Sequence, residues 1–179
     1  MMKTSLPYAF GLSLANALII LLSSLLGYHN DPARFQTGQV TSMVLGSLVV
    51  IAALVLGMRA VRAESPTQSL SFSRAMGTGA AISALSGVIS AVFVYVYGKF
   101  INPEFHQVMY AVQVAQMSER MTASQIEQAE PMMRFLTSAG WIASAQLLFS
   151  PVFGAILSAI VGLFMKRAPQ EAPPAVPAA

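Results

Sequence analysis

The 179-residue sequence predicts an all-α membrane protein with four transmembrane helices and with short amphipathic helices in the second outer loop. Hydrophobic residues make up 55% of the chain and charged residues only 9%, whereas an ordinary soluble domain carries about 25% charged residues. The apolar residues gather in four long stretches, and roughly 20 apolar residues in a helix cross a bilayer core about 30 Å thick. Because lipid offers no partner to backbone N–H and C=O groups, and because the stretches lack the alternation of barrel strands, we expect helices.

The predicted spans cover residues 8–28, 40–58, 75–97 and 139–165. They belong to a single four-helix transmembrane domain over residues 1–167, whose second outer loop covers about 99–138. The tail at 168–179 consists mainly of Pro and Ala and cannot build a packed core, so we expect it to be disordered.

The basic residues indicate how the chain is oriented, because cytoplasmic loops carry an excess of Lys and Arg. Lys3 precedes the first span, Lys166 and Arg167 follow the fourth, and the loop between the second and third spans has three Arg against one Glu. The second outer loop instead has three basic residues against four acidic ones. We therefore expect a multi-pass protein of the inner (cytoplasmic) membrane with both termini in the cytoplasm. The aromatic residues expected at the outer interface are Tyr95, Tyr97, Phe100 and Trp141.

The second outer loop shows helical periodicity. Apolar residues recur at helical spacing from Phe105 to Ala115, and the later segment from Ser124 to Glu127 has the form of a capping box. Pro131 is expected to lie in the second short helix or to end it. These two helices are either a structured connector or a lid or docking surface over the spans.

Two ladders of small residues predict which helices pack closely. Lipid tails are as apolar as leucine, so helices associate in a membrane through close backbone approach, which small side chains permit. The residues spaced by four are Gly79, Ser83, Gly87 and Ala91 in the third span, and Ser150, Gly154, Ser158 and Gly162 in the fourth. We expect these ladders to meet in one antiparallel pair; the alternative is that one of them faces another chain. A weaker ladder, Ser42 and Gly46, lies in the second span.

The strongest polar groups within the predicted spans are the carboxamides of Asn16 and Gln146. Asn and Gln in a span usually hydrogen-bond between helices, with a benefit of about 0.6–2 kcal/mol. The alternative is that they line a path for a polar solute. The serines that would support either arrangement are Ser13, Ser83, Ser86 and Ser90.

Reactive groups are scarce. The predicted spans contain no Asp, Glu, Lys, Arg or His, and the chain has no cysteine. The two histidines, His29 and His106, fall far apart in outer loops where we expect them to be solvated. No sequence motif of a hydrolase, a nucleotide-binding loop or a metalloprotease is present. We therefore predict no catalytic residue, no cofactor and no metal. The basic residues are scattered singly, which does not favour nucleic acid as a partner.

Several short strings resemble a bacterial membrane family known as domain of unknown function 4199. They are Gly57–Arg62, Ser71–Ala75, Tyr97–Phe105 and Ser124–Glu127. Their order and spacing suit the chain up to about Arg167. The resemblance implies a four-helix integral protein of the bacterial cytoplasmic membrane. It implies no established activity and no catalytic residues.

Three functions are compatible with these observations. The leading one is a non-enzymatic accessory, assembly or scaffold subunit, which would have a membrane-protein partner or form a homo-oligomer in the lipid bilayer. The alternative is a small homo-oligomeric transporter or channel for a neutral solute or lipid. An enzyme is the least favoured, because its only candidate groups lie in the second outer loop, at Glu104, His106, Glu127 and Glu130.

Overall fold

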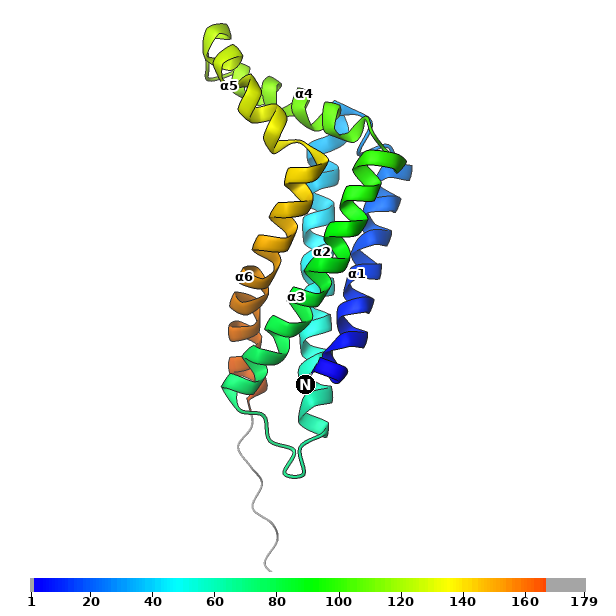
Figure 1. Ribbon diagram of the computed structural model, residues 1–179, viewed down its shortest axis with the longest axis vertical. Coiled ribbons are helices and arrows are strands. Elements are labelled where there is room, and N and C mark those ends of the chain that lie inside the picture. The colour runs from blue at the N-terminus through cyan, green and yellow to red at the C-terminus, as the bar shows by residue number, and fades with distance from the viewer. Residues whose placement is uncertain (1, 167–179) are drawn as a thin grey trace, which may run out of the picture.

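The computed structural model describes residues 2–166 (Figure 1). The expected tail at 168–179 lies outside the described residues. The elements in chain order are α1 (Met2–Leu25), α2 (Pro32–Ala63), α3 (Phe72–Val96), the π-helical turn η1 (Tyr97–Ile101), α4 (Phe105–Ser118), α5 (Ala123–Leu136) and α6 (Ala139–Met165). Four helical segments are long and apolar enough to cross a membrane: α1, α2, α3 continued by η1, and α6. The chain is an all-α membrane protein, as the sequence predicts.

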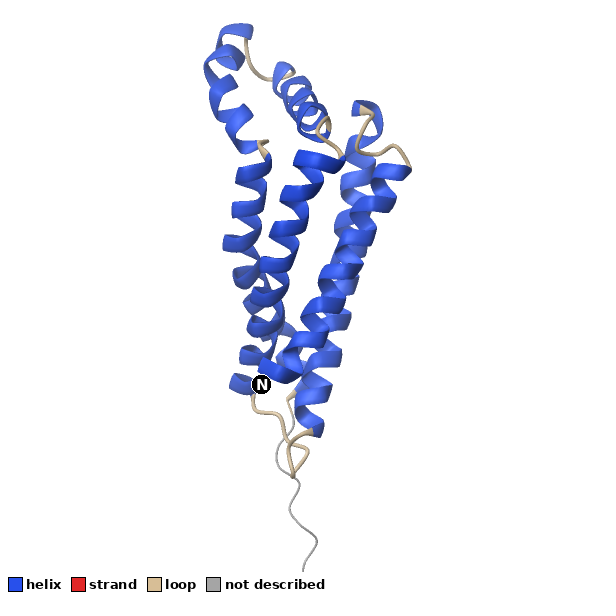
Figure 2. Cartoon of the chain, turned by 45° about the vertical axis from the view of Figure 1, so that its right-hand side comes forward, coloured by secondary structure: helices blue, strands red, loops and turns tan. Residues whose placement is uncertain are grey.

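Helices α4 and α5 lie at one end of the molecule, whereas the start of α1, the α2–α3 connection and the end of α6 lie at the other (Figure 1). We call these the α4–α5 end and the Lys166 end. Around the molecule the long helices follow the order α2, α1, α3, α6. The α1–α2 pair and the α3–α6 pair meet toward the Lys166 end and diverge toward the α4–α5 end (Figure 2).

Helix α2 is longer than the expected span at 40–58, and it includes most of the segment that the sequence assigned to the first outer loop. The helix begins at Pro32 because Asp31 caps it, with the Asp31 carboxylate accepting a hydrogen bond from the Ala33 N–H at 2.9 Å. Proline is favoured in the first helical turn because its missing N–H would have no partner there. Hydropathy marks only the part of the helix that lipid covers, so it could not find this start.

The first helix ends earlier than the expected position 28. Gly27 has φ +79°, a left-handed conformation that favours glycine. The Tyr28 N–H donates to the Ser23 carbonyl and the Gly27 N–H to the Ser24 carbonyl. This is a Schellman motif, which satisfies the last carbonyl groups of α1 and turns the chain toward α2.

The small residues of α3 and α6 lie against each other. A Cβ atom added at Gly79 would collide with Ser158, and one added at Gly154 would collide with Ser83. A Cβ atom at Gly162 would lie 3.1 Å from the Ala75 Cβ. The Ser150 hydroxyl donates to the Ser83 carbonyl at 3.3 Å, a hydrogen bond between the two helices. The absence of side chains at the glycines is therefore what lets these two backbones approach.

The apolar core fills the Lys166 half of the molecule. The largest of its fully buried side chains are Leu54, Met58, Val61, Leu70 and Ile82. Leu157 and Val161 of α6 pack against this core, so α6 meets α2 here. The four long helices consequently pack against one another at the Lys166 end.

The connection between α3 and α6 is helical, but its capping box is not where the sequence placed it. Helix α5 begins at Ala123, and the box pairs Thr122 with Gln125: the Gln125 N–H donates to Thr122 Oγ1 at 3.4 Å, and the Thr122 N–H donates to Gln125 Oε1 at 2.9 Å. Ser124 therefore lies inside the first turn instead of capping it. Threonine and glutamine at this spacing satisfy the same N–H groups as serine and glutamate. Pro131 lies inside α5.

Replacing Gly154 with Ile should destabilise the protein, because the new side chain would collide with Ser83 in the contact between α3 and α6. Overpacking of this kind costs about 1–3 kcal/mol, and sometimes more. Thermal unfolding in mild detergent measures the change. Gly11→Ile is the matched control, because no atom lies within 4 Å of a Cβ atom at Gly11. Unchanged unfolding of Gly154→Ile combined with loss of association between chains would show that this ladder serves another chain instead.

Candidate functional site

The candidate site is a space between the diverging helix pairs in the α4–α5 half of the molecule. Two adjoining cavities of about 410 and 560 Å³ share Asn16, Gln146 and Val50 in their linings. A third, of about 200 Å³, shares Gln39 and Ser42 with the larger one. Volumes in this range are typical of small-molecule sites. We call the continuous space the polar groove, and its lining comes from α1, α2, α3 and α6.

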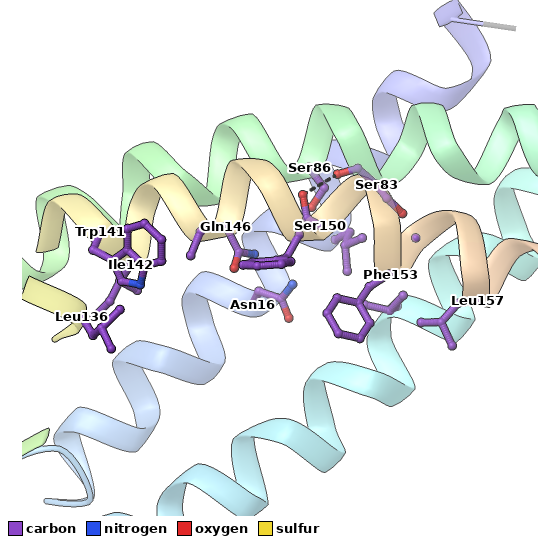
Figure 3. A pocket seen from close by; sticks show the side chains of 15 residues that line it. Asn16, Ser83, Ser86, Leu136, Trp141, Ile142, Gln146, Ser150, Phe153 and Leu157 are labelled. Atoms are coloured by element: carbon purple, nitrogen blue, oxygen red, sulfur yellow. Dashed lines mark hydrogen bonds between the residues drawn. The ribbon is translucent and has the colours of Figure 1, made fainter. Parts of the chain in front are cut away.

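Asn16 and Gln146 both reach into the polar groove, Asn16 from α1 and Gln146 from α6 (Figure 3). Both residues are half-buried. Neither carboxamide makes a hydrogen bond to any group within residues 2–166, so the structural role expected for them, a bond between helices, is not made here. On the α2 side, Gly46 leaves room: a Cβ atom there would lie 3.6 Å from Asn16 Oδ1.

Most serines of the groove have partners. Ser13 Oγ donates to the Ala9 carbonyl at 2.9 Å and lies 3.0 Å from Ser86 Oγ. Ser23 Oγ and Ser42 Oγ lie 3.0 Å apart, joining α1 to α2. Ser90 differs: it is only 6% exposed, and its hydroxyl has no hydrogen-bond partner among the described residues. Ser90 lines the larger cavity, so its free hydroxyl adds to the two free carboxamides.

The groove opens sideways, between α2 and α6. Met43 on α2 is 64% exposed and Phe153 on α6 is 63% exposed, and both line the larger cavity. Phe149, which lines the smaller one, is 52% exposed. Because α2 and α6 are membrane-spanning segments, this opening faces the lipid.

A cluster of polar and aromatic side chains lies at the α4–α5 end of the third cavity. Tyr97, the first residue of η1, is 2% exposed, and its hydroxyl lies 2.6 Å from His29 Nδ1. Asn102 Nδ2 donates to the Tyr97 hydroxyl at 3.1 Å and to Asn30 Oδ1 at 2.8 Å. Phe105 of α4 packs on the rings of both His29 and Tyr97. We call these five residues the Tyr97 cluster. Tyr97 is therefore buried and connects two loops by hydrogen bonds. The prediction that its side chain faces lipid at the outer interface is wrong.

The histidines are not the solvated loop residues that the sequence suggests. Burial lowers the pKa of His29. Burial also lowers the pKa of His106, and nearby backbone groups of Thr137 and Gly98 partly oppose that shift. Both ring nitrogens of His106 are buried, and a Cβ atom added at Gly98 would collide with the ring. The wide turn η1 brings Gly98 against α4, so His106 acts as a packing residue between these elements.

Two of the outer-loop groups considered for an enzyme, Glu130 and His106, make different contacts. Glu130 accepts a hydrogen bond from Arg134 Nε at 2.7 Å, and the same guanidinium lies 4.7 Å above the Tyr110 ring. Glu130 and Arg134 lie on the exposed face of α5, whereas His106 packs against Gly98. Within residues 2–166, no group of three or more His, Asp or Glu residues is arranged to hold a metal ion.

Four apolar spans and a helical connection between the last two define the chain as a multi-pass α-helical membrane protein. The family described as "Protein of unknown function (DUF4199)" matches residues 7–167, and the chain belongs to this family. The family resemblance of the short strings is thereby confirmed. Comparison with curated proteins and with solved structures gave no match.

Sequence reasoning found part of this site. Asn16, Gln146 and Ser90 were expected within the spans, and the structure places all three on the polar groove. Gln39 was missed because it precedes the predicted second span, although its spacing to Ser42 and Gly46 continues one helical face. The Tyr97 cluster was missed because its members are far apart in the chain, and no sequence pattern links them.

Replacing Tyr97 with Phe should destabilise the α4–α5 end, because His29 and Asn102 would lose their shared partner. An unsatisfied buried polar group costs about 1–3 kcal/mol. Hydrogen exchange of residues 26–31 and 97–105 should quicken, with a lower unfolding temperature. Tyr95→Phe is the control, since Tyr95 is 39% exposed and its hydroxyl has no partner within residues 2–166. Equal behaviour of the two variants would contradict a structural role of the Tyr97 hydroxyl.

Acidification should destabilise the protein through its two histidines, because burial lowers the pKa of both in the folded state. The unfolded chain then binds more protons than the folded one below the ordinary pKa of about 6.5. The stabilisation is present above pH 6.5 and is lost as the pH falls through the lowered folded values. Unfolding temperatures between pH 7.5 and 5 should fall less in a His29→Gln/His106→Gln variant. Parallel curves for wild type and variant would show that other groups cause the dependence.

Proposed function

We propose that this is a non-enzymatic membrane protein that works by binding another component of the membrane, and that the polar groove is its binding site. The observation that carries this proposal is the pair of free carboxamides of Asn16 and Gln146 in one cavity. A polar group without a hydrogen-bond partner costs free energy where water is excluded, and water is scarce within the bilayer. A component that hydrogen-bonds to both carboxamides would recover that cost on binding.

The chemistry of the groove supports binding instead of conversion. At Asn16, Gln146 and Ser90 the groove presents carboxamides and a hydroxyl, none of which takes up or releases a proton near neutral pH. Activation of a serine as a nucleophile requires a neighbouring base. His29, the base at the end of the groove, is held by Tyr97. We therefore propose no catalytic residue and no cofactor.

The groove favours one of the two non-enzymatic roles: carriage of a neutral solute or lipid by a small transporter or carrier. A channel fits less well, because the core around Leu54, Met58 and Ile82 fills the Lys166 half. A transporter of this size is expected to form a homo-oligomer, because four helices seldom enclose a path alone.

An accessory, assembly or scaffold subunit is the second candidate, and a different observation favours it. Helix α5 presents exposed apolar side chains beyond the spans, including Met132 at 61% and Phe135 at 54% exposure. A membrane-protein partner would cover this surface. Exposed apolar side chains that gather on one face often mark such contacts.

We also propose that the four long helices form a four-helix bundle in the inner membrane of a bacterium, with both termini in the cytoplasm. The basic residues support this orientation, because cytoplasmic ends of spans are enriched in Lys and Arg. Those at the Lys166 end are Lys3, Arg59, Arg62, Arg74 and Lys166. Glycosylation or cysteine-labelling tags placed in the α2–α3 connection would test the orientation.

The double variant Asn16→Leu/Gln146→Leu should lose the bound component, because both hydrogen-bonding groups of the groove become apolar. Wild type and variant would be extracted from the native membrane in lipid nanodiscs, and everything that co-purifies would be identified by mass spectrometry. We expect one lipid or small molecule to be depleted in the variant.

Gln116→Leu is the matched control, because it removes an exposed carboxamide on α4, away from the groove. A protein partner that remains with all three forms would favour the accessory role. If wild type and the double variant carry the same components in the same amounts, binding in the groove is ruled out.

A further inference from the structure

We infer that the ligand of the polar groove is a membrane amphiphile with an uncharged hydroxyl-bearing or amide-bearing head, which enters sideways from the leaflet next to the α4–α5 end. The inference rests on the proposed binding function and goes further, because it names the chemical class of the ligand and its route. Four properties of the groove support it.

The groove has open hydrogen-bonding positions. The carboxamides of Asn16 and Gln146 each offer N–H donors and a carbonyl acceptor, and neither is used within residues 2–166. Ser90 is more than nine-tenths buried, and its hydroxyl lacks a partner among the described residues. In a membrane helix a serine hydroxyl normally bonds back to a carbonyl of its own helix, as Ser13 does to Ala9. These groups match a head that both donates and accepts hydrogen bonds.

The groove has no charge to pair with a charged head. The two larger cavities are lined by apolar, serine, asparagine and glutamine side chains, with no Lys, Arg, Asp or Glu among them. The third cavity, of about 200 Å³, adds His29, whose burial favours the neutral ring. A phosphate or carboxylate placed here would be buried without an opposite charge, which is far less favourable than burying a hydroxyl with partners.

The groove is closed toward the Lys166 end and open on one side. The core at Leu54 and Ile82 closes it toward the Lys166 end, and both side chains are fully buried. Toward the α4–α5 end the Tyr97 cluster lines the third cavity, and the apolar side chains of Leu136 and Trp141 line the 410 Å³ cavity. The open side lies between Met43 and Phe153, which face lipid. A ligand that is already dissolved in the bilayer reaches this opening, whereas a water-soluble solute has to cross lipid first.

The extent of the groove fits a lipid better than a helix of a partner protein. On α6 the lining runs from Trp141 to Leu157, a distance of about 24 Å along the helix axis, which is shorter than the hydrocarbon core of about 30 Å. The groove ends against the core at Leu54 and Ile82, so a partner helix that crosses the whole bilayer would have to leave it. The exposed apolar side chains of Phe149 and Phe153 are placed to contact the chain of a lipid whose head reaches Gln146.

The test is photolabelling of the full chain in nanodiscs with two probes that differ only in the head: a photoactivatable diacylglycerol and a photoactivatable phosphatidylglycerol with the same acyl chains. Peptide mapping by mass spectrometry locates the labels. We expect diacylglycerol to label the segments that contain Met43 and Phe153, and unlabelled diacylglycerol to compete. Phosphatidylglycerol is expected to label the outer surfaces of the helices without preference for the groove.

Asn16→Leu/Gln146→Leu should reduce groove labelling by about tenfold, which corresponds to about 1.4 kcal/mol. The control Gln116→Leu should leave it unchanged. Gly46→Phe provides a second variant, because it fills the groove from α2 and keeps both carboxamides. If the double variant does not elute as a folded species, the groove labelling of Gly46→Phe is compared with that of the wild type instead.

Equal labelling of the groove by both probes, or labelling that neither variant reduces, would overturn the inference. The native co-purification described above separates this failure from that of the proposed function. If a solute or a protein helix is lost from the carboxamide variant while diacylglycerol never labels the groove, binding stands and the ligand class is wrong. If no component depends on the carboxamides, both proposals fail.

Discussion

The close approach of the α3 and α6 backbones is the constraint on which the rest of this structure depends. Within lipid there is no gain from removing apolar surface from water, so packing and hydrogen bonds must hold the helices together. A serine of the facing helix packs directly against Gly79, and another packs against Gly154. The Ser150 hydroxyl donates a hydrogen bond to the Ser83 carbonyl. This pair fixes one wall of the polar groove. Helix α1 lies on α3, α2 lies on α1, and the remaining gap between α2 and α6 becomes the opening.

The polar groups within the spans separate into two kinds. Serine hydroxyls such as that of Ser13 reach a carbonyl of their own helix and are satisfied locally. Carboxamides are too long and carry too many donors to be satisfied in this way, so Asn16 and Gln146 need partners from elsewhere. The Tyr97 cluster shows that such groups are paired where the α1–α2 loop meets the end of η1. The carboxamides of Asn16 and Gln146, in contrast, lie on a cavity and have no such partner within residues 2–166.

The sequence predicted the architecture well because hydropathy and small-residue spacing are local properties. The fourth span is found at 139–165 as expected, and the ladders that contain Gly87 and Ser158 face each other. The start of α2 depended on a cap at Asp31, which hydropathy does not detect. The groove depended on how far two helix pairs diverge, and the burial of Tyr97 on contacts between distant loops. Such properties arise only when the segments are assembled, so residue patterns alone do not contain them.

The length of α2 indicates how deep in the membrane the Asn16 carboxamide lies. From Gln39 to Arg59 the helix extends about 30 Å, which matches the thickness of the hydrocarbon core. An upright α2 would thus place Gln39 and Arg59 at the two boundaries of the hydrocarbon. Gly46, beside Asn16, then lies about 10 Å below the nearer boundary. Any group that reaches the Asn16 carboxamide has to leave the hydrated headgroup layer and descend by that distance. The position of one glycine on a long helix therefore sets the dehydration that a ligand must undergo, and it selects for head groups that lose water easily.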